Sequence, residues 1–224
     1  MSNPTAILLT IAKRPAAGRT KTRLSPPLTP EQAAQLYECL LRDTLLLLRR
    51  LTGVRRGIVY TPPSARGYFA QLAPDFDLLP QQGDTLGHRL DNALTHYLTH
   101  GYRQVAIMNS DGPTLPLACL QEAFDALARG ADVVLGPSDD GGYYLIGLTR
   151  PAPRLLREVQ MSTPTVLADT LALAAAEGLR VHLLPPWYDV DDAPSLHRLA
   201  RELVDAPPET APHTRRYLAG LPLR

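Results

Sequence analysis

Several features that would indicate other protein classes are scarce in this 224-residue chain. Its two cysteines, Cys39 and Cys119, fall in expected helices and lack the spacing of a metal site. We therefore expect reduced thiols in a cytoplasmic protein. No apolar run reaches the roughly 18 residues that a membrane helix requires. The N-terminus lacks a basic segment followed by a long apolar run, so no signal peptide is expected.

The charge is equally unremarkable, with a net value of +1. No broad electrostatic field therefore predicts binding to a nucleic acid or to a membrane. No internal repeat is visible. A hydrophobic content of 45% is enough for a sizeable core, and the length suits one large domain. We expect a single domain over residues 1–205, followed by a proline-rich tail over residues 206–224.

Familiar catalytic and nucleotide motifs are also missing. The apolar run 5–12 predicts a buried first strand, and the segment KRPAAGRTKTRLSPP follows it. No GxxxxG frame precedes Lys21, so this is not a Walker A loop, and the absence of GxGxxG makes a Rossmann dinucleotide site unexpected. We find no Ser-His-Asp or Cys-His arrangement, and no covalent nucleophile is needed for the chemistry considered below.

The chain does contain a regular alternation of predicted strands and helices, which is typical of an α/β fold. A short return between 131–136 and 143–148 predicts an antiparallel pair within an otherwise mostly parallel, mixed sheet. A proline-rich stretch at 151–156 is expected to be irregular. Strands are expected at 5–12, 56–61, 76–80, 105–108, 131–136, 143–148 and 179–184, and helices at 30–51, 64–72, 85–100, 117–129, 162–177 and 193–204.

The stretch VAIMNSDGPTLP, residues 105–116, organises the rest of the chain. An apolar run turns polar at Asn109, and Pro113 and Pro116 prevent the strand from continuing. Ligands of open α/β sheets bind beyond the carboxyl ends of the strands. Asp111 is therefore either a carboxylate at a ligand site or an aspartate that only makes a turn. This stretch alone does not separate the two interpretations.

A basic loop follows the first strand, at the place where nucleotide-binding α/β folds hold phosphate. Its cations surround Gly18 and would repel one another without an anion. A solvated basic loop is the alternative, which we rank lower. The cations are Lys13, Arg14, Arg19, Lys21 and Arg23.

Two glycine-containing turns mark further parts of a site. In GDTLGHRL, Gly83 precedes a helix with Asp84 as its expected N-cap, and Arg89 is positioned to face a phosphate or a base; a plain surface arginine is the alternative. In PSDDGG, Gly141 and Gly142 give the backbone freedom where a substrate could lie close. Asp140 either lines that site or only makes the turn.

The late segment WYDVDD carries three more carboxylates. In an extended segment Asp189 and Asp191 share one face. Like charges that lie together repel unless a cation or a donor separates them, so a metal is plausible here. Asp192 suits the N-cap of the last helix.

These motifs occur in the order AKRPAAGRTKTRL, GDTLGHRL, NSDGPTLP, GPSDDGGYYLIGL and WYDVDDAPSL. Together they resemble the GT-A-like nucleotide-diphospho-sugar transferase superfamily, in the uncharacterised glycosyltransferase-like family related to 2-phospholactate and molybdopterin guanylyltransferases. The resemblance covers about residues 5–204. It implies an α/β, three-layer αβα sandwich with a mostly parallel mixed sheet, and a nucleoside di- or triphosphate bound with Mg²⁺ or Mn²⁺. The family usually has cysteine at Gly112 and tryptophan at Met161.

Carried over by position, the resemblance implies phosphate contact at Gly18, Lys21, Thr22 and Arg23. Together with the residue-based expectations, the candidate sites form four groups. The catalytic candidates are Lys21, Arg23 and Asp111; the nucleotide-binding candidates are Lys13, Gly18, Lys21, Thr22, Arg23, Gly83 and Arg89; the metal-binding candidates are Asp111 and Asp191 with Asp189 as an alternate ligand; the acceptor-site candidates are Asp140, Gly141 and Gly142.

The leading functional hypothesis is metal-dependent nucleotidyl transfer from an NTP to a small phosphorylated or hydroxyl acceptor. The basic loop favours it, because a triphosphate needs more cationic contacts than a diphosphate. Glycosyl transfer from an NDP-sugar is the alternative, but a glycosyltransferase more typically has Asp-x-Asp where this chain has Asn109-Ser110-Asp111. A non-catalytic nucleotide-binding module is the third. The expected partners are a nucleoside phosphate and a small acceptor, with homodimer formation left open.

Overall fold

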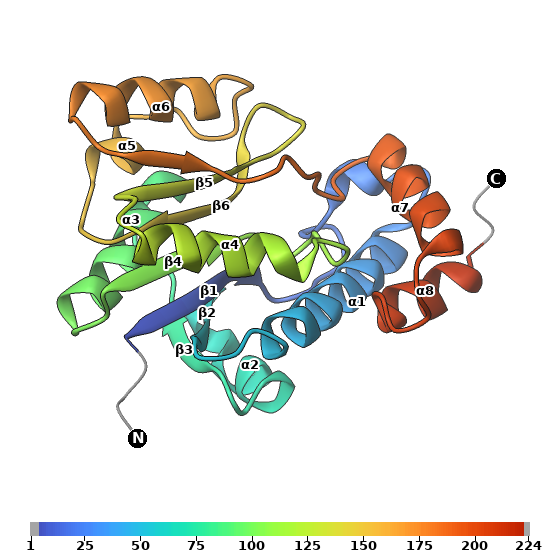
Figure 1. The fold of residues 1–224 in the computed structure, drawn as a ribbon. Helices are drawn as coiled ribbons and strands as arrows, with labels where there is room; N and C mark the ends of the chain where they lie inside the picture. The colour runs from blue at the N-terminus through green and yellow to red at the C-terminus, as the bar shows by residue number, and fades with distance from the viewer. Residues whose placement is uncertain (1–4, 222–224) are drawn as a thin grey trace.

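A seven-stranded sheet forms the centre of the computed structural model, which describes residues 5–221 (Figure 1). The strand order is β3-β2-β1-β4-β6-β5-β7. Among the strands of residues 5–221, only β6 runs antiparallel to its neighbours, β4 and β5, which confirms the predicted mixed sheet. The strands are β1 (Ala6–Lys13), β2 (Arg55–Thr61), β3 (Asp77–Pro80), β4 (Gln104–Met108), β5 (Val133–Pro137), β6 (Tyr143–Leu148) and β7 (Val181–Leu183).

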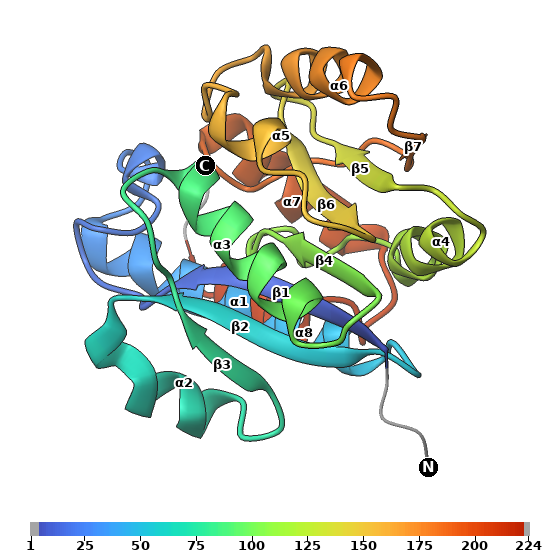
Figure 2. The same ribbon diagram turned by 90° about the vertical axis from the view of Figure 1, so that its left-hand side faces the viewer.

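Helices cover both faces of the sheet and make the three layers that were predicted (Figure 2). Helices α1, α2 and α4 pack on one face, and α3, α5 and α6 pack on the other. Strand residues alternate between the two cores as the pleat requires: Leu8 faces the first, and Ile7 and Leu9 face the second. The helices are α1 (Pro30–Arg49), α2 (Arg66–Leu72), α3 (Leu86–Thr99), α4 (Leu117–Ala128), α5 (Arg154–Arg157), α6 (Val166–Ala176), α7 (Ala193–Asp205) and α8 (Pro212–Ala219), with short 3₁₀ turns at Thr22–Leu24 and Pro63–Ala65.

The helix starts follow capping chemistry, with one correction. Asp192 caps α7 as predicted, since its carboxylate accepts from the backbone N–H of Ser195 at 2.9 Å. The cap of α3 is Thr85, whose hydroxyl accepts from the N–H of His88, so the prediction of Asp84 is wrong by one residue. The side chain of an N-cap residue accepts from the backbone N–H two or three positions further along the chain, and the N-cap residue itself has an extended backbone. Thr85 has that extended backbone. The stretch expected to be irregular at 151–156 contains the start of α5.

The C-terminal segment, expected as a proline-rich tail, contains a helix that packs against α1. Asp43 of α1 is 2% exposed, and its carboxylate accepts from the backbone N–H groups of His213 at 3.1 Å and Thr214 at 2.7 Å. An anion at a helix N-terminus is favourable because the helix dipole is positive there. The boundary at residue 205 remains a prediction. Across residues 5–221, no helix has both the length and the apolar character that crossing a membrane would need.

The topology brings three loops to one edge of the sheet. Strand β1 lies between β2 and β4. The chain continues from β1 to β2 and β3 on one side and then crosses to β4 on the other, so the strand order reverses beside β1. Open α/β sheets bind ligands at such a switch point. The basic loop follows β1, and Asp111 follows β4. The late segment is held beside them because the N–H of Val190 donates to the carbonyl of Asp111 at 3.3 Å.

Candidate active site

The basic loop forms one wall of a cavity of about 400 Å³ at the carboxyl ends of β1 and β4. Most of the predicted nucleotide-binding residues line it, including Lys13, Thr22 and Arg89. Gly18 has a φ of 69° and shapes the loop. Gly83 supports the site indirectly, since its carbonyl accepts from Nε of Arg89 at 2.9 Å. The cations that line this cavity are Lys13, Arg19, Lys21, Arg23 and Arg89.

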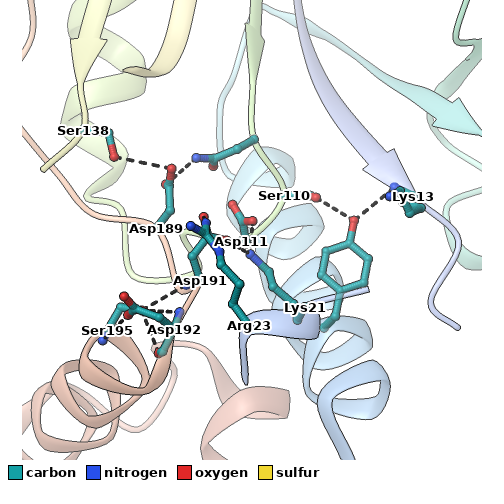
Figure 3. A network of polar contacts seen from close by, with 12 residues as sticks. Lys13, Lys21, Arg23, Ser110, Asp111, Ser138, Asp189, Asp191, Asp192 and Ser195 are labelled. Carbon is teal, nitrogen blue, oxygen red and sulfur yellow. Dashed lines mark hydrogen bonds and ion pairs between the residues drawn. The ribbon is translucent and has the colours of Figure 1, made fainter. Parts of the chain in front are cut away.

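Lys21 lies at the centre of the site, between two of the predicted metal ligands (Figure 3). Its ammonium donates to Asp111 Oδ2 and, at 2.5 Å, to Asp191 Oδ1. The side chain is 7% exposed, and the residue has a φ of 51°, in the left-handed region that glycine prefers. Burial alone would lower the pKa of Lys21, but Asp111 and Asp191 outweigh it and raise the pKa. Lys21 is therefore a charged ammonium held between two carboxylates.

Asp191 is the best neutralised carboxylate of the cluster. Its second oxygen accepts from Nη2 of Arg23 at 2.7 Å. Burial opposes ionisation, yet Lys21 and Arg23 together lower the pKa of Asp191. Burial raises the pKa of Asp111, against the pull of Lys21. The side chain of Arg23 is 72% exposed, so it can also reach a ligand in the cavity.

Asp189 lies on the other side of the cluster and contacts different partners from Asp191. Its carboxylate accepts from Nδ2 of Asn109 and lies 3.4 Å from Oγ of Ser138. Burial, followed by the charge of Asp111, raises the pKa of Asp189 to about 8. Within residues 5–221, Lys21 and Arg23 are the cations that pair with this cluster, and the charge of Asp111 adds to the effect of burial on Asp189.

A second cavity, of about 190 Å³, adjoins the first and shares Ile11 and Leu86 with it. Two of the three predicted acceptor-site residues, Asp140 and Gly142, line this cavity. Gly141 instead lies against Pro164, where a β-carbon would come within 2.1 Å of the proline carbonyl oxygen. Asp189 lines the second cavity and Asp111 the first, so the carboxylates stand between the two.

Tyr37, Ser110 and Gln81 also line the basic cavity, and sequence reasoning missed all three. The Tyr37 hydroxyl is 2.8 Å from Oγ of Ser110 and accepts from the N–H of Lys13 at 3.1 Å, which ties α1 to the loops after β1 and β4. Nothing in the sequence separates Tyr37 from the other inward-facing residues of a long amphipathic helix. Ser110 could have been found, because it precedes Asp111 in the motif.

Among residues 5–221, no group of three histidine, cysteine or acidic side chains is arranged to hold a metal ion. The oxygen atoms nevertheless suit a hard cation. Asp111 Oδ1 and Asn109 Oδ1 are both buried without a hydrogen-bond partner in the described part of the chain. A buried acceptor without a donor is costly, and oxygen is the ligand that Mg²⁺ prefers. The donor set therefore fits a divalent cation beside Lys21.

Comparison with known proteins identifies the family. The family described as "Uncharacterized protein conserved in bacteria (DUF2064)" matches residues 44–163, and the chain belongs to it. A solved protein from Desulfovibrio desulfuricans, described as a candidate nucleotide-diphospho-sugar transferase, is 31% identical. The alignment covers 97% of this chain and 95% of that one, with a TM-score of 0.90. No curated protein sequence matches the chain.

More distant structures share the fold. CMP:2-keto-3-deoxy-manno-octonic acid synthetase, solved with CTP, is 12% identical with a TM-score of 0.54, over 89% of this chain and 98% of that one. A Mycobacterium tuberculosis protein solved with manganese is 15% identical with a TM-score of 0.52, over 87% and 97%. The predicted GT-A-like fold is confirmed. The chain is an enzyme of the transferase type.

Proposed function

We propose that this protein catalyses nucleotidyl transfer from a nucleoside triphosphate to a small acceptor, with the help of a divalent cation. The observation that carries the proposal is the basic cavity at the switch point of the sheet, where cations meet the Asp111 and Asp191 carboxylates. A triphosphate is the anion that matches this number of cations. The adjoining second cavity offers a place for the acceptor on the far side of the carboxylates.

The reaction needs stabilisation of charge rather than a covalent nucleophile. An acceptor oxygen would attack the α-phosphorus, and the bond from that phosphorus to the pyrophosphate oxygen would break. Lys21 and Arg23 would neutralise the charge that develops on the phosphate oxygens. Asp111 and Asp191 would hold a divalent cation, with Asp189 as the alternate ligand, and the cation would supply further charge neutralisation.

Glycosyl transfer from an NDP-sugar is the second candidate, and the 31% identical protein described as a candidate nucleotide-diphospho-sugar transferase favours it. The two candidates differ in the leaving group: pyrophosphate in the first, a nucleoside diphosphate in the second. Asn109 favours the first candidate, because it stands where a glycosyltransferase would more typically supply another carboxylate. A binding module without catalysis is not carried further, since the family relation places the chain among transferases.

Thermal-shift measurements with a panel of NTPs and NDP-sugars, with and without MgCl₂, would test the donor. We expect an NTP to stabilise the protein in a Mg²⁺-dependent manner, and Asp111→Asn to abolish that dependence. Dependence that survives in Asp111→Asn would count against the metal assignment.

A pyrophosphate-release assay would then test catalysis. We expect Arg23→Gln to lower kcat/KM about a hundredfold. Arg55→Gln is the matched control, because Arg55 pairs with Asp77 on the sheet, away from the site, and should leave the rate unchanged. Release of a nucleoside diphosphate from an NDP-sugar, with no pyrophosphate from any NTP, would establish the second candidate instead.

A further inference from the structure

The two cavities of the site differ sharply in charge. Five lysine and arginine side chains line the first cavity. The second cavity is lined by no lysine, arginine or histidine among the described residues. The cavities share Ile11 and Leu86 in their walls, so this difference arises between two adjoining cavities. The first cavity suits an anionic nucleotide, whereas the second offers no positive charge to another anion.

The walls of the second cavity are largely apolar and belong to rigid elements. Ile107 of β4 and Ile146 of β6 are 2% and 1% exposed, and Val166 begins α6. Leu86, which lines both cavities, is 41% exposed, so a ligand in either cavity can contact it. The cavity of about 190 Å³ has the volume of about six waters. It therefore suits a small apolar body.

Most polar groups of this cavity present acceptors or use their donors within the protein; the Tyr143 hydroxyl donates to Sδ of Met161 at 3.9 Å, and the Ser162 hydroxyl is a further donor. Asp189 and Asp140 contribute carboxylates, and Asn109 already uses its Nδ2 as a donor to Asp189. The Thr163 and Tyr144 hydroxyls donate to the carbonyls of Gln160 and Pro185, each at 3.0 Å. A ligand with a hydroxyl or ammonium group would supply the missing donors. A phosphate or carboxylate would instead find no cation in the described wall and would lie beside the Asp140 carboxylate, which is unfavourable when desolvated.

We propose that the acceptor is an alcohol with a small apolar body that is neutral or positively charged, and that phosphate monoesters and carboxylates are excluded. The inference rests on the proposed function, since it assigns the partner of the same reaction. The alcohol oxygen forms the new bond to the α-phosphorus. The bond to pyrophosphate breaks, pyrophosphate takes that electron pair, and the hydroxyl proton passes to solvent.

The test measures binding of matched probes to the full chain, both free and loaded with the NTP that stabilises it. Benzyl alcohol and benzyl phosphate share one apolar body and differ in charge. Chemical shifts of the methionine methyl groups report binding at Met108 and Met161, which both line the cavity, and Met108 remains as the reporter when Met161 is replaced. We expect the alcohol to bind at least about tenfold more tightly than the phosphate. Equal affinities, tighter binding of the phosphate, or no binding of either probe would overturn the proposal.

Two variants make the test specific to the cavity. Met161→Lys places a cation in the wall and should bring the affinity for benzyl phosphate up to that for the alcohol. Met161→Leu is the matched control, which changes the side chain without adding charge and should keep the preference for the alcohol. If Met161→Lys fails to fold, Thr163→Lys introduces the same charge at a half-buried position of the same wall. An unchanged preference in the folded lysine variant would contradict the inference.

The failure of this inference is distinguishable from a failure of the proposed function. If no NTP binds, the proposed function fails, while the preference between probes is still measurable on the free protein. If an NTP binds and benzyl phosphate is preferred, the proposed function survives and the acceptor class is wrong. Pyrophosphate release in the presence of benzyl alcohol but not benzyl phosphate would support both.

Discussion

The side-chain amide of Asn109 donates to the carboxylate of Asp189, 80 residues further along the chain. This contact joins the loop after β4 to the late acidic segment. It also explains why an asparagine suits this position: a carboxylate here would face Asp189 without a donor between them. The half-buried Asp189 is already disfavoured as an anion, with a pKa of about 8.

Asn109→Asp should therefore destabilise the protein in the absence of metal. The substitution removes a donor to a half-buried carboxylate and adds a like charge, so we expect a loss of about 2–4 kcal/mol in the free energy of unfolding. Urea unfolding measures it. Asn92→Asp is the control, because it also removes one donor, to the carbonyl of Gln82 at 2.9 Å, but this hydrogen bond is exposed and Arg157 contacts the new carboxylate, so we expect a loss of less than about 1 kcal/mol. Equal midpoints for wild type and Asn109→Asp would contradict the argument.

Lys21 acts in this structure as the cation between Asp111 and Asp191. Lys21→Met leaves two carboxylates facing each other, with Arg23 as the remaining cation that contacts them among residues 5–221. Removing one partner of a buried ion pair costs about 3–5 kcal/mol, and we expect a loss of that order in the free energy of unfolding. If the carboxylates bind a divalent cation, MgCl₂ should restore part of the loss, as measured by thermal unfolding in increasing MgCl₂.

Arg23→Gln is the matched control for that titration. Arg23 pairs with Asp191 from a largely exposed side chain, so its loss should cost about 0–1 kcal/mol. A Mg²⁺-induced rise in melting temperature that is no larger for Lys21→Met than for wild type would count against metal binding by these carboxylates.

The sequence predicts those parts of the site that depend on local chemistry. An apolar run that ends in proline and glycine locates β4 and its terminal Asp111, and capping chemistry locates Asp192 at the start of α7. The contacts of Lys21 are different, because its partners lie 90 and 170 residues away. Their meeting depends on the strand order, and no local pattern encodes a single pairing over such distances. The basic loop was therefore predicted to contact phosphate, while the ion pairs of Lys21 were not foreseen.

Asp132 provides a pH-dependent test away from the site. The carboxylate of Asp132 accepts from the backbone N–H of Arg180 at 3.0 Å and from Nε of Arg180 at 3.1 Å. The backbone hydrogen bond, and then the side-chain one, lower the pKa of Asp132. The folded-state pKa therefore lies below the unfolded-state value of about 3.9. The stabilisation is present above the unfolded-state pKa and is lost as the pH falls through the folded-state pKa.

Asp132→Asn should accordingly lower the free energy of unfolding by about 1 kcal/mol at neutral pH. The difference from wild type should shrink as the pH falls below about 4, where Asp132 becomes protonated. Thermal unfolding of both proteins across this range measures it. A difference that stays constant into acid would show that the stabilisation does not depend on the ionised carboxylate.

Gly141 allows the turn beside the second cavity to pack against the start of α6. Its φ is 86°, and a β-carbon would come within 2.1 Å of the carbonyl oxygen of Pro164. Gly178 also has a positive φ, of 65°, but a β-carbon there would meet nothing within 4 Å. Gly178→Ala should therefore cost only the backbone strain of about 1 kcal/mol, whereas Gly141→Ala must also displace the turn and should cost more than about 2 kcal/mol. Urea unfolding compares the two variants, and equal losses would contradict the close approach of Gly141 to Pro164.

The two neighbours of Gly141 in the sequence, Asp140 and Gly142, line the second cavity. Gly141→Ala should therefore also weaken binding of benzyl alcohol, whereas Gly178→Ala should leave that binding unchanged.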